Sequence, residues 1–201
     1  MTDNEPIHEA LAAIVHATAS PGASWVVGGS AGLMLRGLPL AAEPRDLDIY
    51  CDDEDVALIY EALRQYAVDE PELSVTGMYR SRLCHFHIKG IQVELVGGFQ
   101  VTADGCRYVT DVKNLLIPYG DVVSFGDGSR EAAVVPLAHE LWFNRLRGRE
   151  DRVALIANAF AAAPGRHEEA LEAIEAGNSF TAAAKSGVRR LIGLREAGDA
   201  R

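Results

Sequence analysis

The segments WVVGGSAGLMLRG (residues 25–37) and PRDLDIY (residues 44–50) decide the fold of this chain. Apolar residues at the start of the first segment predict a short strand that runs directly into a Gly-Gly-Ser turn at residues 28–30. Residues 31–36 then predict a helix. A strand, a glycine turn and a helix in direct succession indicate that the turn lies at one end of a sheet.

The turn has the composition of an anion site. Gly28 and Gly29 let the backbone approach a ligand closely, and Ser30 adds a hydroxyl donor. We expect Ser30 to be the N-cap of the helix and Gly37 to end it. A helix start offers unpaired N–H groups and partial positive charge, which favour phosphate. A tight turn that merely needs glycine is an equally good alternative.

Residues 46–51 alternate acidic and apolar side chains and predict a second strand. The period of two places Asp46 and Asp48 on one face, with Leu47 and Ile49 on the other. Two neighbouring carboxylates repel each other unless a cation or a proton intervenes. The pair therefore predicts a site for a hard cation such as Mg²⁺, whereas an isolated pair would be a solvated edge.

A hairpin is predicted for residues 82–89 and 91–96 around the turn Lys89-Gly90. A two-residue turn pairs Ile88 with Ile91, and further along the ladder it pairs His85 with Glu94. One face is then apolar, with Cys84, Phe86, Ile88, Ile91, Val93 and Leu95, and the other is polar, with His85, His87, Gln92 and Glu94.

The remaining pattern predicts a mixed α/β (α+β) fold. A helix is expected at 7–19, a helix at 54–66 capped by Asp52 and Asp53, a weaker strand at 75–79, turns at 104–105 and 126–128, and helices at 137–146, 151–162, 167–176 and 181–194. We place a boundary near Pro136. Residues 1–135 would form an α/β domain with flanking helices, and residues 136–201 a helical C-terminal region.

Charge and cysteine content narrow the class of protein. The 201 residues carry a net charge of −10, so we expect a small-molecule or protein partner rather than bulk nucleic acid, unless arginines cluster. Three separated cysteines, Cys51, Cys84 and Cys106, indicate free thiols in a reducing compartment. No signal-peptide pattern or apolar run of membrane-spanning length occurs, which predicts a cytoplasmic protein without a membrane partner, as a monomer or a homodimer.

The two opening segments together resemble the nucleotidyltransferase superfamily. They are most similar to the branch that holds small antibiotic nucleotidyltransferases and type IV abortive-infection toxins. The matching residues are Gly29 and Ser30 in GGSAGLMLRG, and Asp46 and Asp48 in PRDLDIY, and the likeness covers roughly residues 25–97. The family also has a third carboxylate on a later strand, and Glu94 in IQVELVGG matches that place.

The resemblance implies a metal-dependent enzyme that moves a nucleoside monophosphate from an NTP to an acceptor. Asp46, Asp48 and Glu94 would be its catalytic and metal-binding residues, with Mg²⁺ or Mn²⁺ as cofactor. Gly28, Gly29, Ser30, Arg45 and Arg149 would bind the nucleotide, with Arg145 and Arg147 as further candidates for the triphosphate. The acceptor would be a small molecule such as an antibiotic, or a protein or RNA group.

Two departures from the family pattern keep an alternative open. The family more often has Asp where this chain has Glu94, and Asn144 stands about where a Lys is expected. The alternative is a binding or regulatory protein that keeps the fold and has weakened or lost the chemistry. Convergence of the three carboxylates would favour the enzyme, and wide separation would favour the alternative.

Other polar clusters have simpler explanations. His85 and His87 share the face of Glu94, where His85 could pair with Glu94 across the strands or lie beside a metal. Cys84 faces the opposite side of that strand, which excludes a shared tetrahedral zinc site. The acidic run at 52–55 fits a helix N-terminus, and the 126–129 segment fits a hairpin turn.

Overall fold

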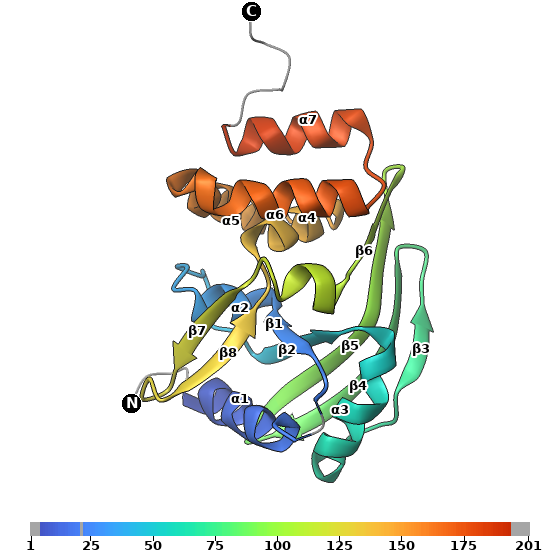
Figure 1. Cartoon of the computed structure of the whole chain (residues 1–201), viewed down its shortest axis with the longest axis vertical. Coiled ribbons are helices and arrows are strands. Elements are labelled where there is room, and N and C mark those ends of the chain that lie inside the picture. Colours follow the sequence, from blue (N-terminus) through green and yellow to red (C-terminus); the bar gives the residue numbers. More distant parts are fainter. Residues whose placement is uncertain (1–4, 21, 194–201) are drawn as a thin grey trace, which may run out of the picture.

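The computed structural model describes residues 5–20 and 22–193, and it combines a twisted sheet with a stack of helices at one end (Figure 1). The strands are Trp25–Gly28 (β1), Asp46–Cys51 (β2), Glu72–Val75 (β3), Tyr79–Ile88 (β4), Ile91–Ala103 (β5), Cys106–Val109 (β6), Asp121–Phe125 (β7) and Arg130–Val134 (β8). The α-helices are Glu5–Thr18 (α1), Gly29–Leu35 (α2), Val56–Leu63 (α3), Leu137–Leu146 (α4), Glu150–Ala162 (α5), Pro164–Gly177 (α6) and Ala182–Leu191 (α7). Short 3-10 turns, Asp53–Asp55 and Arg64–Tyr66, flank α3, and a π-helical turn covers Val112–Leu116.

The sheet is mixed, as predicted. Its strand order is β3-β4-β5-β2-β1-β8-β7, with β6 paired to β5. The pairs β2–β5 and β1–β8 are parallel, and the other pairs are antiparallel. The central position of β2 matters for function, because it brings the predicted carboxylates next to both β1 and β5.

The hairpin register predicted from the sequence is confirmed. Lys89 and Gly90 adopt positive φ angles of 53° and 82°, and Ile88 pairs with Ile91, Phe86 with Val93 and His85 with Glu94. Positive φ at both central residues is the geometry of a type I′ turn, which matches the twist of a hairpin. The turns at Gly105 and at residues 126–128 also join antiparallel strands.

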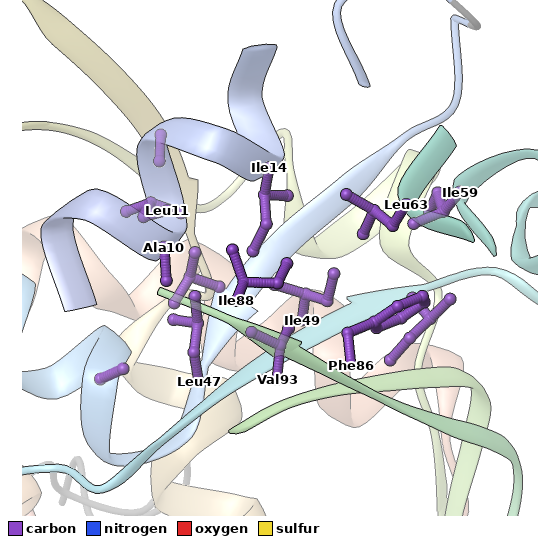
Figure 2. Packing of buried hydrophobic residues seen from close by; sticks show 14 of the residues in the cluster. Ala10, Leu11, Ile14, Leu47, Ile49, Ile59, Leu63, Phe86, Ile88 and Val93 are labelled. Carbon is purple, nitrogen blue, oxygen red and sulfur yellow. The ribbon is translucent and has the colours of Figure 1, made fainter. Parts of the chain in front are cut away.

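Helices α1 and α3 cover one face of the sheet. Figure 2 shows Ile14 and Leu11 of α1 and Ile59 and Leu63 of α3 around the buried side chains of the central strands. These strand residues are the predicted apolar set. Ile91 is partly buried, and the others are fully buried, namely Leu47, Ile49, Cys84, Phe86, Ile88, Val93 and Leu95. The acidic residues of β2 therefore lie on the opposite face, which α1 and α3 leave uncovered.

A second core joins helices α4 to α7 to the other end of the sheet. Trp142 of α4 and Ile174 of α6 belong to the same buried cluster as Leu33 of α2, Val101 of β5 and Tyr108 of β6. The helical region therefore packs directly on the α/β part. The assignment of residues 1–135 and 136–201 to two domains stays a prediction.

Several predicted boundaries were wrong. Helix α2 begins at Gly29, and its N-cap is Gly28 without a side-chain bond, so Ser30 is not the cap. The strand expected at 75–79 is displaced: β3 ends at Val75, because the Thr76 hydroxyl accepts the N–H groups of Met78 and Tyr79 and forms a turn.

The acidic run before α3 also differs from its prediction. The Asp52 carboxylate accepts the N–H groups of Val112 (2.8 Å) and Lys113 (3.0 Å), at the start of the π-helical turn whose N-cap is Asp111. Neither Asp52 nor Asp53 makes a side-chain cap to α3. The last predicted helix continues at least to Leu191, and its predicted end at Leu194 lies outside the described residues. The three cysteines are free, as expected, and all three are buried. No helix in the described part of the chain has the length and apolarity to cross a membrane.

Candidate functional site

Three neighbouring strands bring the predicted site residues together. Gly28 at the end of β1 is the antiparallel partner of Asp48 on β2. Asp48 is in turn the parallel partner of Glu94 on β5, and Asp46 precedes it by two residues on the same face. Partner residues on neighbouring strands point to the same face, so the glycine turn, Asp46, Asp48 and Glu94 are neighbours on one face of the sheet.

The two glycines serve close packing against β2. Gly29 has a φ of +61°, and a β-carbon there would collide with Asp48 Oδ2 and lie 3.2 Å from Asp48 Cγ. A β-carbon on Gly28 would collide with the ring of Tyr50. The turn therefore needs glycine to let the Asp48 carboxylate lie directly on its backbone.

A fourth carboxylate, from helix α4, closes the turn on the other side. Glu140 is 1% exposed, and its Oε1 accepts the backbone N–H of Gly29 at 2.7 Å. Its Oε2 accepts the side-chain amide of Asn144 at 3.0 Å. Sequence analysis missed Glu140, because a single Glu within a helix gives no motif. Its only sequence signal is an acid inside HELWF, among side chains that belong in a core.

The carboxylates of the site disfavour one another's charge. The pKa of Asp48 is raised to about 7, first by burial and then by the charges of Asp46, Glu94 and Glu140, while Arg147 opposes the rise. Burial also raises the pKa of Glu140 to about 7, opposed by its hydrogen bonds and by two arginines. The arginines near this group do not balance the negative charge of its carboxylates. Such an imbalance favours the binding of a cation.

A polar hollow of about 150 Å³, here called the arginine hollow, opens beside the glycine turn. It is lined by Gly29, Ser30, Leu33, Asp46, Asp48, Glu140, Phe143, Asn144, Arg147, Arg149 and Arg152. Nη1 of Arg152 is buried there and has no hydrogen-bond partner among the described residues. A buried guanidinium N–H without an acceptor indicates a place for an anionic ligand group.

A second hollow of about 230 Å³, here called the aromatic hollow, lies on the other side of Asp48. It is lined by Asp48, Tyr50, Ser74, Thr76, Tyr79, Ser81, Leu83, Glu94, Val96, Phe99, Phe143 and Arg147. Asp48, Phe143 and Arg147 line both hollows. Arg147 stacks 4.8 Å from the centre of the Phe143 ring and donates to the Tyr79 hydroxyl at 3.2 Å, so it forms the partition between them.

The carboxylates fit a divalent cation in part. No group of three or more His, Cys, Asp or Glu side chains within residues 5–20 and 22–193 is arranged to hold a metal ion. Glu94 Oε1 is engaged by the Gln92 amide at 3.1 Å. Asp46 and Asp48, however, provide two carboxylates on one face, and Mg²⁺ is commonly held by one or two carboxylates together with substrate phosphates. The donor chemistry therefore suits a cation that arrives with a nucleotide.

The structure separates the predicted nucleotide-binding residues into two sets. Gly29, Ser30 and Arg149 line the arginine hollow. Gly28 packs on Tyr50, and Arg45 is exposed just before β2, so neither lines a hollow. Among the other predicted arginines, Arg147 lines both hollows, while Arg145 pairs with Glu150 at 3.0 Å outside them. Arg152 was missed by the sequence analysis.

The side chain of His85, on the carboxylate face, has a different main partner from the one predicted. His85 Nδ1 lies 2.6 Å from Asp69 Oδ2, and the His85 backbone N–H donates to Asp69 Oδ1 at 2.6 Å. Its Nε2 lies 4.0 Å from Glu94 Oε1, which is too long for a hydrogen bond. His85 and Glu94 therefore pair across the strands, but their side chains make only an electrostatic contact.

Comparison with solved structures identifies the fold. No protein-family model and no curated protein sequence matches the chain. A candidate nucleotidyltransferase from Thermotoga maritima aligns over 80% of this chain and 95% of its own, with a TM-score of 0.62 and 24% identity. The antibiotic-resistance factor ANT(2'')-Ia aligns over 94% of this chain and 99% of its own, with a TM-score of 0.51 and 12% identity. The chain therefore has the nucleotidyltransferase fold, as the sequence predicted.

Proposed function

We propose that this protein transfers a nucleoside monophosphate from an NTP to an acceptor, with a divalent cation as cofactor. The observation that carries the proposal is the half-buried Asp48 carboxylate, which lies on the Gly29 backbone, with Asp46 two residues before it and Glu94 beside it on β5. It faces a hollow walled by three arginines. A crowded acidic group beside a cationic hollow suits a metal nucleotide, which carries both signs of charge.

The arginine hollow would hold the triphosphate. Arg147, Arg149 and Arg152 present guanidinium groups that bind phosphate oxygens well, and Nη1 of Arg152 has no other partner among the described residues. Ser30 adds a hydroxyl donor at the turn. The Gly29 N–H, in contrast, is already bound by Glu140, so Gly29 would contribute close approach and not a free donor.

Asp46 and Asp48 would hold the divalent cation, with Glu94 next to them on β5. When bound, the cation would neutralise the triphosphate and act as a Lewis acid on the phosphorus that is attacked. The acids themselves provide a fixed negative field, so a metal nucleotide would bind better than a metal-free one.

The aromatic hollow would receive the acceptor, because Glu94 lines it and Asp48 lies between it and the arginine hollow. An acceptor hydroxyl oxygen would form a bond to the α-phosphorus, and the bond to the pyrophosphate oxygen would break. Glu94 would take the hydroxyl proton, and pyrophosphate would leave through the arginine hollow. The identity of the acceptor, the preferred base, the oligomeric state and a cytoplasmic location stay predictions.

A non-catalytic nucleotide-binding protein is the second candidate. Two features favour it: the described residues contain no ready cluster of three metal-binding side chains, and Asn144 stands where a Lys was expected. The Asn144 amide instead donates to the Glu140 carboxylate. Because this amide is neutral, it does not supply the positive charge of a Lys. This candidate predicts nucleotide binding without turnover.

Calorimetric titration of each NTP with Mg²⁺ tests the proposal on the wild type, on Asp48→Asn and on Glu61→Gln. Glu61 is an exposed acid of α3 that pairs with Arg64 away from the site, so it controls for removal of a surface charge. Metal-dependent binding that is lost in Asp48→Asn and kept in Glu61→Gln would support the proposal and justify an acceptor screen. Binding of no NTP by the wild type would contradict it.

A further inference from the structure

Glu140 is a buried carboxylate without a cationic partner in contact. No Lys, Arg or His of the described residues lies within ion-pair distance of it, and its two hydrogen-bond partners, Gly29 and Asn144, are neutral. A buried charge without such a partner costs several kcal/mol in solvation, so its presence requires a reason. The hydrogen bond to Gly29 does not explain why the residue is a Glu, because the neutral side-chain carbonyl of a Gln would also accept the Gly29 N–H.

The position of Glu140 suggests that reason. Asp48 and Glu140 lie on opposite sides of Gly29: Asp48 Oδ2 occupies the place of its missing β-carbon, and Glu140 Oε1 accepts its N–H at 2.7 Å. Both acids line the arginine hollow. The charge of Glu140 raises the pKa of Asp48, and burial raises the pKa of both carboxyl groups. The turn is thus held between two carboxylates that come from different parts of the chain.

We propose that Glu140 is a positioning residue of the nucleotide–metal site, which holds the Gly29 turn against Asp48 and supplies buried negative charge that the bound cation compensates. This inference rests on the proposed function, since it concerns the same cation. Glu140 acts through Gly29 and through its field, and it need not touch the cation. The uncompensated charge destabilises the metal-free protein, and its attraction to the cation stabilises the metal-bound protein.

The two variants Glu140→Gln and Glu140→Asp separate charge from shape. Gln keeps the size and an acceptor for the Gly29 N–H but removes the charge. We expect the melting temperature of Glu140→Gln without metal to be unchanged or higher than wild type, and its affinity for Mn²⁺ to be roughly tenfold weaker, as for loss of an outer partner of a metal site. Asp keeps the charge on a shorter side chain, so it should melt lower and bind Mn²⁺ more tightly than Gln does.

The measurements use Mn²⁺ alone and the whole 201-residue chain at pH 8. Free Mn²⁺ is followed by electron paramagnetic resonance, and melting by differential scanning calorimetry with and without Mn²⁺. Glu175→Gln is the matched control: Glu175 is 5% exposed on α6, but it pairs with Arg189 at 2.8 Å outside both hollows. It should melt lower than wild type and bind Mn²⁺ normally.

The outcomes distinguish the inference from the function on which it rests. Weaker Mn²⁺ binding by Glu140→Gln without loss of metal-free stability supports the positioning role. Wild-type Mn²⁺ affinity in Glu140→Gln, or a fall in stability like that of Glu175→Gln, overturns it while the proposed function stands. If the wild type binds no Mn²⁺ that Asp48→Asn loses, this inference fails, whereas the proposed function, in which the cation arrives with a nucleotide, is decided separately by the titration of NTP with Mg²⁺. If Glu140→Gln does not fold, an affinity of Glu140→Asp no better than that of Asp48→Asn overturns the role.

Discussion

The carboxylate of Asp48 rests on the backbone of Gly29, in the space that any other residue would fill with its β-carbon. The contact joins the end of β1 to the middle strand of the sheet, and the pairing of Gly28 with Asp48 fixes its register. The acid and the turn are therefore one structural unit, and a change at either residue should disturb both.

Replacement of Gly29 by Ala should lower both stability and metal binding. The new β-carbon would push Asp48 away, and the positive φ of +61° adds strain. We expect a loss of about 1–3 kcal/mol in the free energy of unfolding, measured by urea denaturation. Mn²⁺ binding should fall to the level of Asp48→Asn.

Gly37→Ala is the matched control for that variant. Gly37 ends α2 with a φ of +80°, and a β-carbon there would meet no atom within 4 Å. It should therefore show only the backbone cost of about 1 kcal/mol, with Mn²⁺ affinity unchanged. Equal Mn²⁺ affinity in the two alanine variants would exclude the proposed contact role of Gly29.

Arg147→Ala should weaken nucleotide binding by about tenfold or more, because a charge-assisted hydrogen bond contributes roughly 1.5–3 kcal/mol. Arg147 lines both hollows and lowers the pKa of Asp48. Without Mg²⁺ the arginines alone offset the charge of the triphosphate, so the loss of affinity should be largest for the metal-free NTP. Calorimetry of ATP with and without Mg²⁺ measures the difference.

Arg145→Ala provides the comparison, because Arg145 lies two residues away on α4 but pairs with Glu150 outside the hollows. It should bind nucleotide like the wild type. Similar losses in the two variants would mean that the general charge of this helix matters, and not the position of Arg147.

The buried His139 should make the protein sensitive to acid. Its Nδ1 lies 2.6 Å from the Tyr108 hydroxyl, and burial lowers its pKa to about 3. Between about pH 6.5 and pH 3 the unfolded chain binds a proton there that the folded chain does not. The free energy of unfolding should therefore fall as pH decreases through this range, by at most about 1.4 kcal/mol per pH unit from this group.

Denaturation by urea from pH 7 to pH 4 tests this assignment in two variants. Tyr108→Phe removes the hydroxyl and should keep the pH dependence, whereas Tyr108→Phe/His139→Leu should lose the part due to His139. His16→Gln, at an exposed position of α1, should behave like the wild type. An unchanged slope in the double variant would assign the acid sensitivity to other groups.

Asp121→Ala should destabilise the attachment of α2. The guanidinium of Arg36, at the end of α2, pairs with Asp121 of β7 and donates to the Val135 carbonyl, and its side chain is 8% exposed. Removal of Asp121 leaves this buried charge without its partner, for which about 3–5 kcal/mol is typical. Glu61→Ala breaks an exposed pair and should cost less than about 1 kcal/mol in the same urea experiment.

Local patterns predicted the strands of the site well. The alternation around Asp46 and Asp48 and the two-residue turn at Lys89-Gly90 fix which side chains share a face, because a strand has a period of two. The pairing of His85 with Glu94 followed from that turn. The parallel pairing that brings Glu94 beside Asp48 was implied by the resemblance alone, since it joins strands far apart in the sequence.

Contacts made by single side chains at long range could not be predicted. Glu140 reaches Gly29 across 111 positions, and Asp52 binds the first N–H groups of a turn about 60 positions away. In both cases a carboxylate satisfies backbone N–H groups of another segment, and no local pattern carries that information. The displaced strand at residues 75–79 is a different case, because the Thr76 hydroxyl binds residues only two and three positions away, so this turn was a local signal that was overlooked.

The shared core of the helical region has a consequence for inheritance. Leu33, Val101 and Tyr108 pack in one cluster with Trp142 and Ile174, so the surface of the α/β part and that of the helices are complementary halves. Recombination between distant relatives near residue 136 would join halves that were never fitted to each other. Substitutions on the two sides should therefore be correlated.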